Sequence, residues 1–523
     1  MPNDVTPQRV RPLPVVRQVF PVIVALVVCT LLAAGCTPSS PPSPSPGKVK
    51  KAGLNSHRRV KGFVITYKLG TAMAAGDVSA AQTALPRVEG GAQLSVTRPM
   101  PPQGMYVQVN SPSLGRAALE RVMNDIARDK RVQVVEPVFD RPASRTPGAL
   151  PTDYPNDPEY KKEQWNLTNK DVGIRVRGAW EQGALGRGVT IAVIDSGYAK
   201  HTDLPDEEKE GTPRKVLKGI TIITGKDRAS DGSIEDKGTT GDGAQDPGDW
   251  AHEDLCGQGF PKKDRDSSWH GTNVMGIAAA STNNGKWVAG TAPEATILPI
   301  RISGPCEWKD EDLLEALFWL RGTQIKGLTD IEERPKVVNI SLGGQKKCPP
   351  SIKNAFDSLH DEGITVIIGA GNGFEGKAQE VKDRYPANCS ENPIIVGASD
   401  EKGNYWELSS YGTGLDVLAP GVDVYSLSNT GKTKANKENG AKETGTSFAA
   451  PHVAGIAALL YSKYPNLTPS QVKEVIKTGA RKPLQGNCRS APAHCGSGVV
   501  DANKALKGAG EILGGRRREA TKK

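Results

Sequence analysis

The chain has 523 residues, 37% of them hydrophobic, which is enough for a short targeting segment, a small domain and a large domain with a buried core. Its net charge of +9 is concentrated at the two ends, with +6 in residues 1–58 and +4 in residues 514–523, so the body between them has a net charge of −1. A body without excess positive charge offers no basic surface for phosphate, and this distribution argues against a nucleic-acid-binding protein.

The N-terminal segment has the pattern of an export signal. Three arginines precede an apolar run over residues 19–35, which Pro21 and Thr30 alone interrupt. This run is short for a membrane-spanning helix but typical of the hydrophobic region of a signal peptide. We therefore predict a signal peptide at residues 1–35 and export of the rest of the chain.

The apolar run ends in Leu-Ala-Ala-Gly-Cys, with the cysteine at Cys36. Small residues followed by Cys resemble the bacterial lipobox, in which the cysteine is lipidated and becomes the mature N-terminus; Ala33 stands where that box more often has Leu. The alternative is an ordinary signal peptide cut near Ala34, which would release a secreted protein. Residues 36–59 begin with a Ser/Pro-rich stretch that has no means of forming a core, and we predict a tether there.

Residues 60–140 have the pattern of a small α+β unit. Alternating apolar residues predict strands over residues 60–67, 105–109 and 132–139, and apolar residues at helical spacing predict a helix over residues 114–129.

A linker and a large domain follow. Residues 141–163 are predicted to be a linker open to cleavage, because five prolines fall within residues 141–158. Beyond Gln164 strands and helices alternate, which implies an α/β fold with a mostly parallel sheet and helices on both of its faces. We assign residues 164–507 to this domain and residues 508–523 to a basic tail, whose end, residues 516–523, we expect to be disordered.

Polar residues stand at the ends of two predicted strands. Asp195 lies at the carboxyl end of a strand within residues 188–197, and Asn372 ends a strand within residues 365–373 with Gly on both sides. Ligands of open α/β sheets bind at the carboxyl ends of the strands. Taken singly, Asp195 would more often be a cap or loop residue, and Asn372 a turn residue.

Two further polar residues stand at the beginnings of small-residue helices. His270 follows Trp269 in WHGTNVMGIAA, and Ser447 lies in GTSFAAPHVAG, whose apolar continuation indicates a helix buried on all sides. The unpaired N–H groups of such a helix start suit an oxyanion. Pro451 is expected in the first turn, where its missing N–H does no harm. Taken singly, His270 could be a core residue whose hydrogen bonds are satisfied, and Ser447 could be a helix cap.

A long polar stretch, rich in Gly and Asp, separates Asp195 from His270 over about residues 224–254. Its carboxylates could bind calcium, but they lack the regular spacing of a ligand loop such as the EF-hand. We therefore predict a solvated surface insertion.

Together these motifs resemble the subtilisin-like serine proteases. The resemblance covers about residues 164–506 and implies that family's three-layer fold. The order Asp, His, Ser separates it from the trypsin-like and α/β-hydrolase arrangements of the same triad. It rests on four motifs in the family's order: Asp195 in DSG, His270 in HGT, Asn372 in GAGN and Ser447 in GTSFAAPHVAG. It implies that Ser447 is the nucleophile, His270 the general base and then acid, Asp195 its orienting partner, and Asn372 with the Ser447 N–H the oxyanion hole.

The resemblance also implies a substrate site. One segment looks like the family's substrate-pairing strand, which adds the peptide to a sheet edge, and a second segment would complete the wall of the primary specificity pocket. The first comprises Ser341, Leu342 and Gly343, and the second Gly369, Ala370 and Gly371.

The chain departs from the family pattern in places. Asn273 stands where the family usually has a second His, and Met275 where it usually has Ala; both are expected behind the triad, where they would affect packing. The insertion before His270 is long for the family, and the calcium-ligand loops do not align. Structural calcium is therefore an open expectation, and no cofactor is expected to be required for the chemistry.

Cysteine usage agrees with export. Cys29 would leave with the signal and Cys36 would carry lipid, which leaves six cysteines with fifteen possible pairings. No CxxC motif is present. The alternative is that all six cysteines are free thiols in the reducing cytosol, which would conflict with the predicted export signal. Similar extracellular subtilases suggest the pairs Cys256–Cys306 and Cys348–Cys389, and closeness in sequence suggests Cys488–Cys495.

The resemblance suggests a role for residues 60–140. A small β-α-β module directly before a protease resembles the inhibitory propeptides of secreted proteases, so we expect a zymogen that cuts itself within residues 141–158. The alternative is a binding or adhesion module that stays attached.

The sequence therefore predicts an exported, lipid-anchored serine endopeptidase of the cell envelope, acting on proteins or peptides and partnered in cis by its own propeptide. A cell-surface binding protein on an inactive protease fold is the alternative from another class, and a missing triad residue would have favoured it. A serine esterase or lipase would show GxSxG and the order Ser, Asp, His, and neither is found.

Overall fold

The computed structural model describes most of the chain from residue 60 onward. The described residues are 48–49, 60–86, 93–100, 104–110, 116–139, 154–208, 214–228, 233–235, 238–306, 308–482 and 487–520. The predicted signal peptide, Cys36 and the predicted linker up to residue 153 lie outside these ranges. Within them, no helix has both the length and the apolar character needed to cross a membrane.

The residues predicted to form a small α+β unit build a five-stranded sheet with two helices. The strands, in spatial order, are β1 (Lys48–Val49), β5 (Val132–Phe139), β2 (Val60–Tyr67), β4 (Gly104–Asn110) and β3 (Gln93–Met100), and the helices are α1 (Val78–Thr83) and α2 (Arg116–Ala127). β1 pairs with β5 in parallel, and the other pairs are antiparallel. The sequence predicted β2, β4, β5 and α2 but missed β1, β3 and α1, which have weaker apolar patterns.

This unit has a hydrophobic core of its own. Phe63 and Ile65 of β2 and Met105 and Val107 of β4 are fully buried, because alternate residues of a strand point to the same face. Ile126 of α2 belongs to the same cluster.

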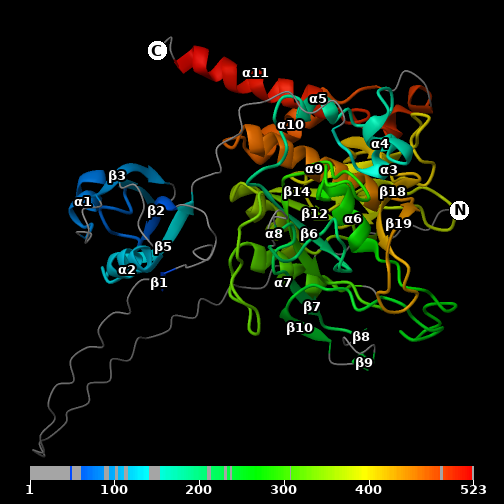
Figure 1. Ribbon diagram of the computed structural model, residues 1–523, viewed down its shortest axis with the longest axis horizontal. Helices are drawn as coiled ribbons and strands as arrows, with labels where there is room; N and C mark the ends of the chain where they lie inside the picture. Colours follow the sequence, from blue (N-terminus) through cyan, green and yellow to red (C-terminus); the bar gives the residue numbers. More distant parts are fainter. Residues whose placement is uncertain are drawn as a thin grey trace, which may run out of the picture. The chain divides into compact units, whose positions relative to one another are not determined.

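The large α/β part is organised around an eight-stranded sheet (Figure 1). In spatial order its strands are β10 (Thr239–Asp242), β7 (Ile220–Ile223), β11 (Thr296–Arg301), β6 (Thr190–Asp195), β12 (Val337–Ile340), β14 (Thr365–Gly369), β16 (Ile394–Ser399) and β17 (Val417–Pro420). All neighbouring pairs are parallel except β10 with β7. The expectation of a mostly parallel sheet is confirmed.

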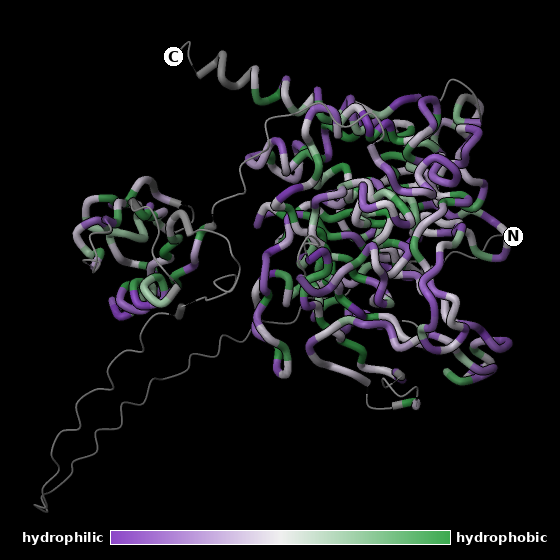
Figure 2. Tube along the Cα trace, viewed as in Figure 1, coloured by the Kyte–Doolittle hydropathy of each residue, from purple (hydrophilic) through white to green (hydrophobic). Residues whose placement is uncertain are grey.

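Two hydrophobic cores lie on opposite faces of this sheet. In β6, Ile191 and Val193 belong to one core, whereas Ala192 and Ile194 belong to the other. Helices cover both cores: α6 (His270–Ala279) and α9 (Thr446–Lys463) the first, α7 (Asp310–Leu320) and α8 (Pro350–Asp361) the second. The fold is therefore the expected three-layer arrangement, and Figure 2 shows hydrophobic segments gathered in its interior.

The remaining elements complete the described part. They are the helices α3 (Pro158–Lys162), α4 (Trp165–Thr168), α5 (Arg177–Trp180), α10 (Pro469–Gly479) and α11 (Ala502–Ala520), the strand pairs β8 (Asp227–Arg228) with β9 (Ile234–Glu235), β13 (Gly344–Gln345) with β15 (Arg384–Tyr385) and β18 (Val424–Asn429) with β19 (Glu438–Glu443), and 3-10 turns at Val381–Asp383, Asn487–Arg489 and Pro492–His494. α6 packs against β18 as well as against α9, so the β18–β19 hairpin adjoins the first core.

The predicted disordered tail differs from the structure. α11 continues through the residues assigned to the tail as far as Ala520, and Ala505, Leu506 and Ala509 on its first turns are buried in the first core. The helix is rich in Ala, Leu, Lys and Arg, which favour helical conformation. The prediction of disorder is therefore wrong up to residue 520.

Three disulfides stabilise the large part. They join Cys256 to Cys306, Cys348 to Cys389 and Cys488 to Cys495. These are the pairs that the resemblance and the sequence spacing suggested.

Candidate active site

The carboxyl end of β6 and the start of α6 bring Asp195 and His270 together. The His270 Nδ1 atom lies 2.7 Å from Asp195 Oδ1; the Asp195 side chain is fully buried, whereas the His270 side chain is 23% exposed. Gly271 permits this approach, since a Cβ atom there would lie 2.1 Å from the Gly197 carbonyl oxygen. The Ser196 N–H donates to the same Asp195 oxygen at 2.8 Å and so fixes the carboxylate.

Asp195 controls the protonation of His270. Burial alone would lower the pKa of His270, but the negative charge of Asp195 and its hydrogen bond outweigh burial, so the pKa of His270 is raised above its usual 6.5. The Phe448 ring packs against the imidazole, with the ring centroids 5.2 Å apart. A partly exposed imidazole that is held by a buried carboxylate can accept a proton from a neighbouring hydroxyl.

Ser447, the second residue of α9, is joined to Ser341 by two hydrogen bonds. The Ser447 hydroxyl donates to the Ser341 carbonyl oxygen at 3.0 Å, and the Ser341 hydroxyl donates to the Ser447 carbonyl oxygen at 2.8 Å. The second bond replaces a missing helical one, because Pro451 lies four residues further along and has no N–H to donate. The prediction that Pro451 occupies the first turn is wrong: it lies inside the helix, and Ser341 supplies the donor.

Asn372 follows β14 and contacts the residue before Ser447. Its Oδ1 accepts hydrogen bonds from the backbone N–H and the hydroxyl of Thr446, both at 3.0 Å. Because this oxygen is occupied, the amide nitrogen is the group left to donate to a ligand. Gly445 leaves room beside it, since a Cβ atom there would lie only 3.2 Å from Asn372 Nδ2.

A pocket of about 240 Å³ opens beside Ser447. Seven of its lining residues were predicted as site residues: Ser341, Leu342, Gly343, Gly369, Gly371, Asn372 and Ser447. Ala370 was also expected in this wall, but it is fully buried in the second core instead. The sequence missed the other four lining residues, Ser303, Trp308, Arg384 and Thr446. Apart from Thr446, they come from segments without a motif, so no local signal could have found them.

Two carboxylates of the predicted solvated insertion lie behind the His–Asp pair. Asp246 accepts a hydrogen bond from the Ser196 hydroxyl at 3.1 Å, and Asp249 accepts from the N–H and hydroxyl of Ser268 at 2.6 and 2.7 Å. Burial, together with the charge of Asp249, raises the pKa of Asp246 well above its usual range. The surface prediction is therefore wrong for these buried residues, which hold serines within two positions of the paired aspartate and histidine.

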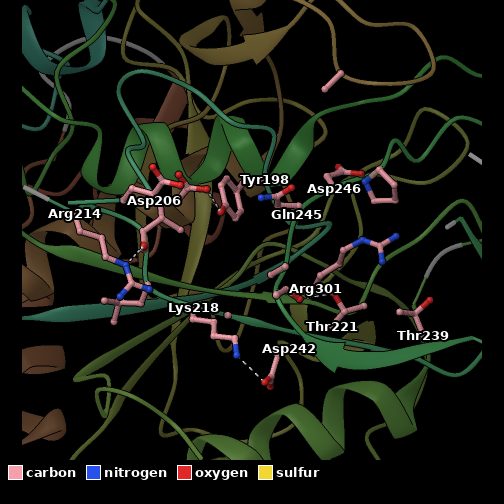
Figure 3. A pocket seen from close by; sticks show the side chains of 18 of the residues that line it. Tyr198, Asp206, Arg214, Lys218, Thr221, Thr239, Asp242, Gln245, Asp246 and Arg301 are labelled. Atoms are coloured by element: carbon pink, nitrogen blue, oxygen red, sulfur yellow. Dashed lines mark hydrogen bonds and ion pairs between the residues drawn. The ribbon is translucent and has the colours of Figure 1, made fainter. Parts of the chain in front are cut away.

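A larger polar pocket, of about 1010 Å³, borders the same stretch (Figure 3). Figure 3 shows Lys218 turned toward Asp242, and their charged groups lie 2.8 Å apart. Arg301, in the same wall, is held by the buried Asp227 with an Nη1–Oδ2 distance of 2.8 Å. These cations are thus paired within the protein, and the pocket contains none of the predicted catalytic residues.

The described residues contain no cluster of three or more His, Cys, Asp and Glu side chains that could hold a metal ion, and structural calcium stays a prediction. Asn273 and Met275, the two departures from the family pattern, are buried. Neither polar atom of the Asn273 side chain has a hydrogen-bond partner in the part of the chain that the structure describes.

Known proteins are similar to this chain in sequence and architecture. Residues 186–504 match the model of the Subtilase family, Peptidase_S8. The chain is 36% identical over 471 residues to an extracellular protease of Xanthomonas campestris pv. campestris, covering 88% of this chain and 75% of that protein. It is 34% identical over 393 residues to an extracellular basic protease of Dichelobacter nodosus, covering 74% of this chain and 60% of that protein. The solved structure of a protease from Pseudoalteromonas arctica is similar, with a TM-score of 0.60 and 33% identity over 68% of this chain and 99% of that one.

Proposed function

The chain belongs to the subtilase family of serine proteases, and on this premise we propose that it hydrolyses peptide bonds within proteins through Ser447, His270 and Asp195. The observation that carries the proposal is the 2.7 Å contact between His270 and the buried Asp195. A buried carboxylate that orients an imidazole and stabilises its protonated form is the support that a general base needs for acyl transfer through a serine.

The proposed first step forms an acyl-enzyme. The Ser447 hydroxyl turns from the Ser341 carbonyl toward Nε2 of His270, which takes its proton as Ser447 Oγ bonds to the substrate carbonyl carbon. Asp195 stabilises the resulting imidazolium. The carbonyl oxygen becomes an oxyanion that accepts hydrogen bonds from the Asn372 amide and the Ser447 N–H.

The remaining steps release the two products. His270 gives its proton to the leaving amine as the C–N bond breaks, and the acyl group stays on Ser447. A water molecule then attacks the ester, giving its proton to His270, and the acid leaves as Ser447 recovers its proton. Residues 341–343 would hold the peptide as an added strand, with one side chain in the pocket beside Ser447.

Ser447→Ala tests this assignment. The purified wild type should hydrolyse casein and gain the mass of one sulfonyl group from a sulfonyl fluoride, located on Ser447 by peptide mapping. The Ser447→Ala variant should do neither, while Ser351→Ala, at an exposed position in α8, should match the wild type. Labelling of another residue, or full activity of Ser447→Ala, contradicts the proposal.

The proposal extends to maturation: residues 60–140 act as an inhibitory propeptide. Their separate hydrophobic core supports a unit that folds alone, and a parallel sheet built from distant strands folds slowly enough to gain from a template. β5 leads directly into the proline-rich linker, where Ser447 of the same molecule would cut.

Export from a host without other secreted proteases tests self-processing. Wild type should yield a shorter protein that begins in the linker, and Ser447→Ala should remain one chain from the mature N-terminus through residue 523. Trimming of the variant at the same place contradicts self-cleavage. An uncut but active wild type contradicts the propeptide role.

The N-terminal anchor is part of the same proposal. Relatives named as extracellular proteases support export, and the sequence before Cys36 supports lipidation. Cys36→Ala should release the protein from the detergent phase or stop its processing. Unchanged fractionation and mass would mean that Cys36 carries no lipid.

A further inference from the structure

The pocket beside Ser447 contains a buried arginine, Arg384. Arg384 lies in β15, which pairs with β13 next to the segment 341–343, and its side chain lines the pocket. Only 8% of the residue is exposed. Among the described residues no carboxylate lies within ion-pair distance of its guanidinium, and its buried Nε atom has no hydrogen-bond partner.

The other buried arginine among the described residues has a carboxylate partner. Arg301 makes two hydrogen bonds to Asp227, and the partly buried Arg481 lies 3.1 Å from Asp501. An uncompensated buried charge destabilises a fold. Because no carboxylate of the described residues pairs with Arg384, we infer that a ligand supplies its counter-charge.

Arg384 packs closely against the walls of the pocket, and its burial strengthens its electrostatic attraction for an anion. Its Nε atom is 2.5 Å from the position that a Cβ on Gly371 would occupy, so the side chain lies flat against the glycine backbone. Trp308 of the pocket stacks on Tyr385, with ring centroids 5.5 Å apart and planes 16° apart. Burial lowers the pKa of Arg384, but an arginine keeps its charge at neutral pH.

Two acidic residues of neighbouring segments are paired with other cations. Asp310, beside Tyr385, forms an ion pair with Lys346, and Glu380 forms one with Lys382 at 2.8 Å. Among the described residues that line the pocket there is no Asp or Glu, so the charge of Arg384 makes this lining positive.

We propose that Arg384 makes this protein selective for peptides with Glu or Asp directly before the scissile bond. The inference rests on the proposed function, because it takes the pocket beside Ser447 as the site of that side chain. The planar guanidinium can form two parallel hydrogen bonds with a carboxylate, which an apolar side chain cannot replace. An apolar substrate side chain in the pocket would be buried beside Arg384 without neutralising the charge of its guanidinium.

Matched peptide substrates test the selectivity. Two tetrapeptide nitroanilides that differ only in Glu or Leu before the scissile bond are hydrolysed by the mature wild type, Arg384→Met, Arg384→Lys and the surface control Arg334→Met. Wild type and Arg334→Met should favour Glu. Arg384→Met should lower kcat/KM for the Glu peptide by about 10- to 100-fold, as expected for lost hydrogen bonds to a charged group, and leave or raise that for Leu. Arg384→Lys should retain part of the preference, because it keeps the charge but not the planar pair of donors.

Cleavage sites in casein, mapped by mass spectrometry with the wild type alone, test the same inference without any variant. Enrichment of Glu and Asp directly before the cut supports it, even if Arg384→Met does not fold. Casein and Leu-peptide hydrolysis without acidic preference overturns this inference and leaves the proposed function intact. Loss of all hydrolysis, with casein as well as both peptides, overturns the proposed function and this inference with it.

Discussion

Replacing Asn372 by Ala should slow peptide hydrolysis strongly while changing substrate binding little. The Asn372 amide nitrogen is proposed to donate to the oxyanion, which exists in the transition state and not in the bound substrate. Its loss therefore lowers kcat more than it raises KM.

The magnitude follows from the bonds around Asn372. Loss of one oxyanion donor removes about 2.7–4 kcal/mol of transition-state stabilisation, a value that itself comes from an asparagine of a subtilisin. At about 1.36 kcal/mol per tenfold change, kcat should fall about 100- to 1000-fold. The variant also loses both hydrogen bonds to Thr446, which should destabilise the fold by about 1–3 kcal/mol in total.

A graded variant separates positioning from donation. Thr446→Val keeps the backbone N–H that binds Asn372 Oδ1 but removes the hydroxyl, which donates to Asn372 Oδ1 and accepts from the Gly371 N–H, both at 3.0 Å. Loss of the neutral hydrogen bond to Asn372, of about 1 kcal/mol, should lower kcat at least about fivefold. Asn354→Ala, at an exposed position in α8, is the matched control and should leave kcat unchanged.

Steady-state hydrolysis of a peptide nitroanilide gives kcat and KM, and titration with a sulfonyl fluoride counts the folded sites. The reasoning is refuted if Asn372→Ala retains more than about a tenth of kcat per titrated site, or if its loss appears in KM alone.

Three further outcomes are expected. Asp195 raises the pKa of His270 above 6.5, and His270 must be neutral to act as the base, so the acidic limb of the kcat/KM profile should lie above pH 6.5. Asp195→Asn should move this limb to lower pH and reduce the rate. A wild-type limb at or below pH 6.5 contradicts the pairing of His270 with Asp195. Replacing Cys256 and Cys306 by Ser removes a disulfide between residues 50 apart in the chain and should lower the free energy of unfolding by about 4 kcal/mol. Urea denaturation of proteins that also carry Ser447→Ala, which prevents self-digestion, measures the difference. A change below about 1 kcal/mol contradicts this expectation. Deletion of residues 516–523 should leave casein hydrolysis unchanged, and a large loss would show that the end of α11 contributes to the site.

Much of the fold follows from local patterns. The apolar alternation of β2 and β4 and the continuous apolar run of β6 report burial on one or both faces, so strands and sheet type were predictable from neighbouring residues alone. β3 and α1 were missed because polar residues interrupt their patterns, and tertiary packing rather than local preference holds them in place.

The catalytic candidates belong to the same predictable class. Asp195 and Asn372 follow strands of one parallel sheet, and His270 and Ser447 begin helices that pack on it, so their motifs and order were enough to expect them at one edge. The hydrogen bond between His270 and Asp195 agrees with that expectation.

The sequence alone therefore determined the family, the sheet and the candidate triad, because each depends on short patterns and their order. The tertiary structure decided the rest: that Ser341 replaces the donor missing at Pro451, that Asp246 lies buried behind the site, and that Arg384 lines the pocket with no counter-charge from the described residues. Each of these depends on contacts between residues far apart in the chain. No local pattern encodes such contacts, since they arise only when the folded sheet brings its loops to one edge.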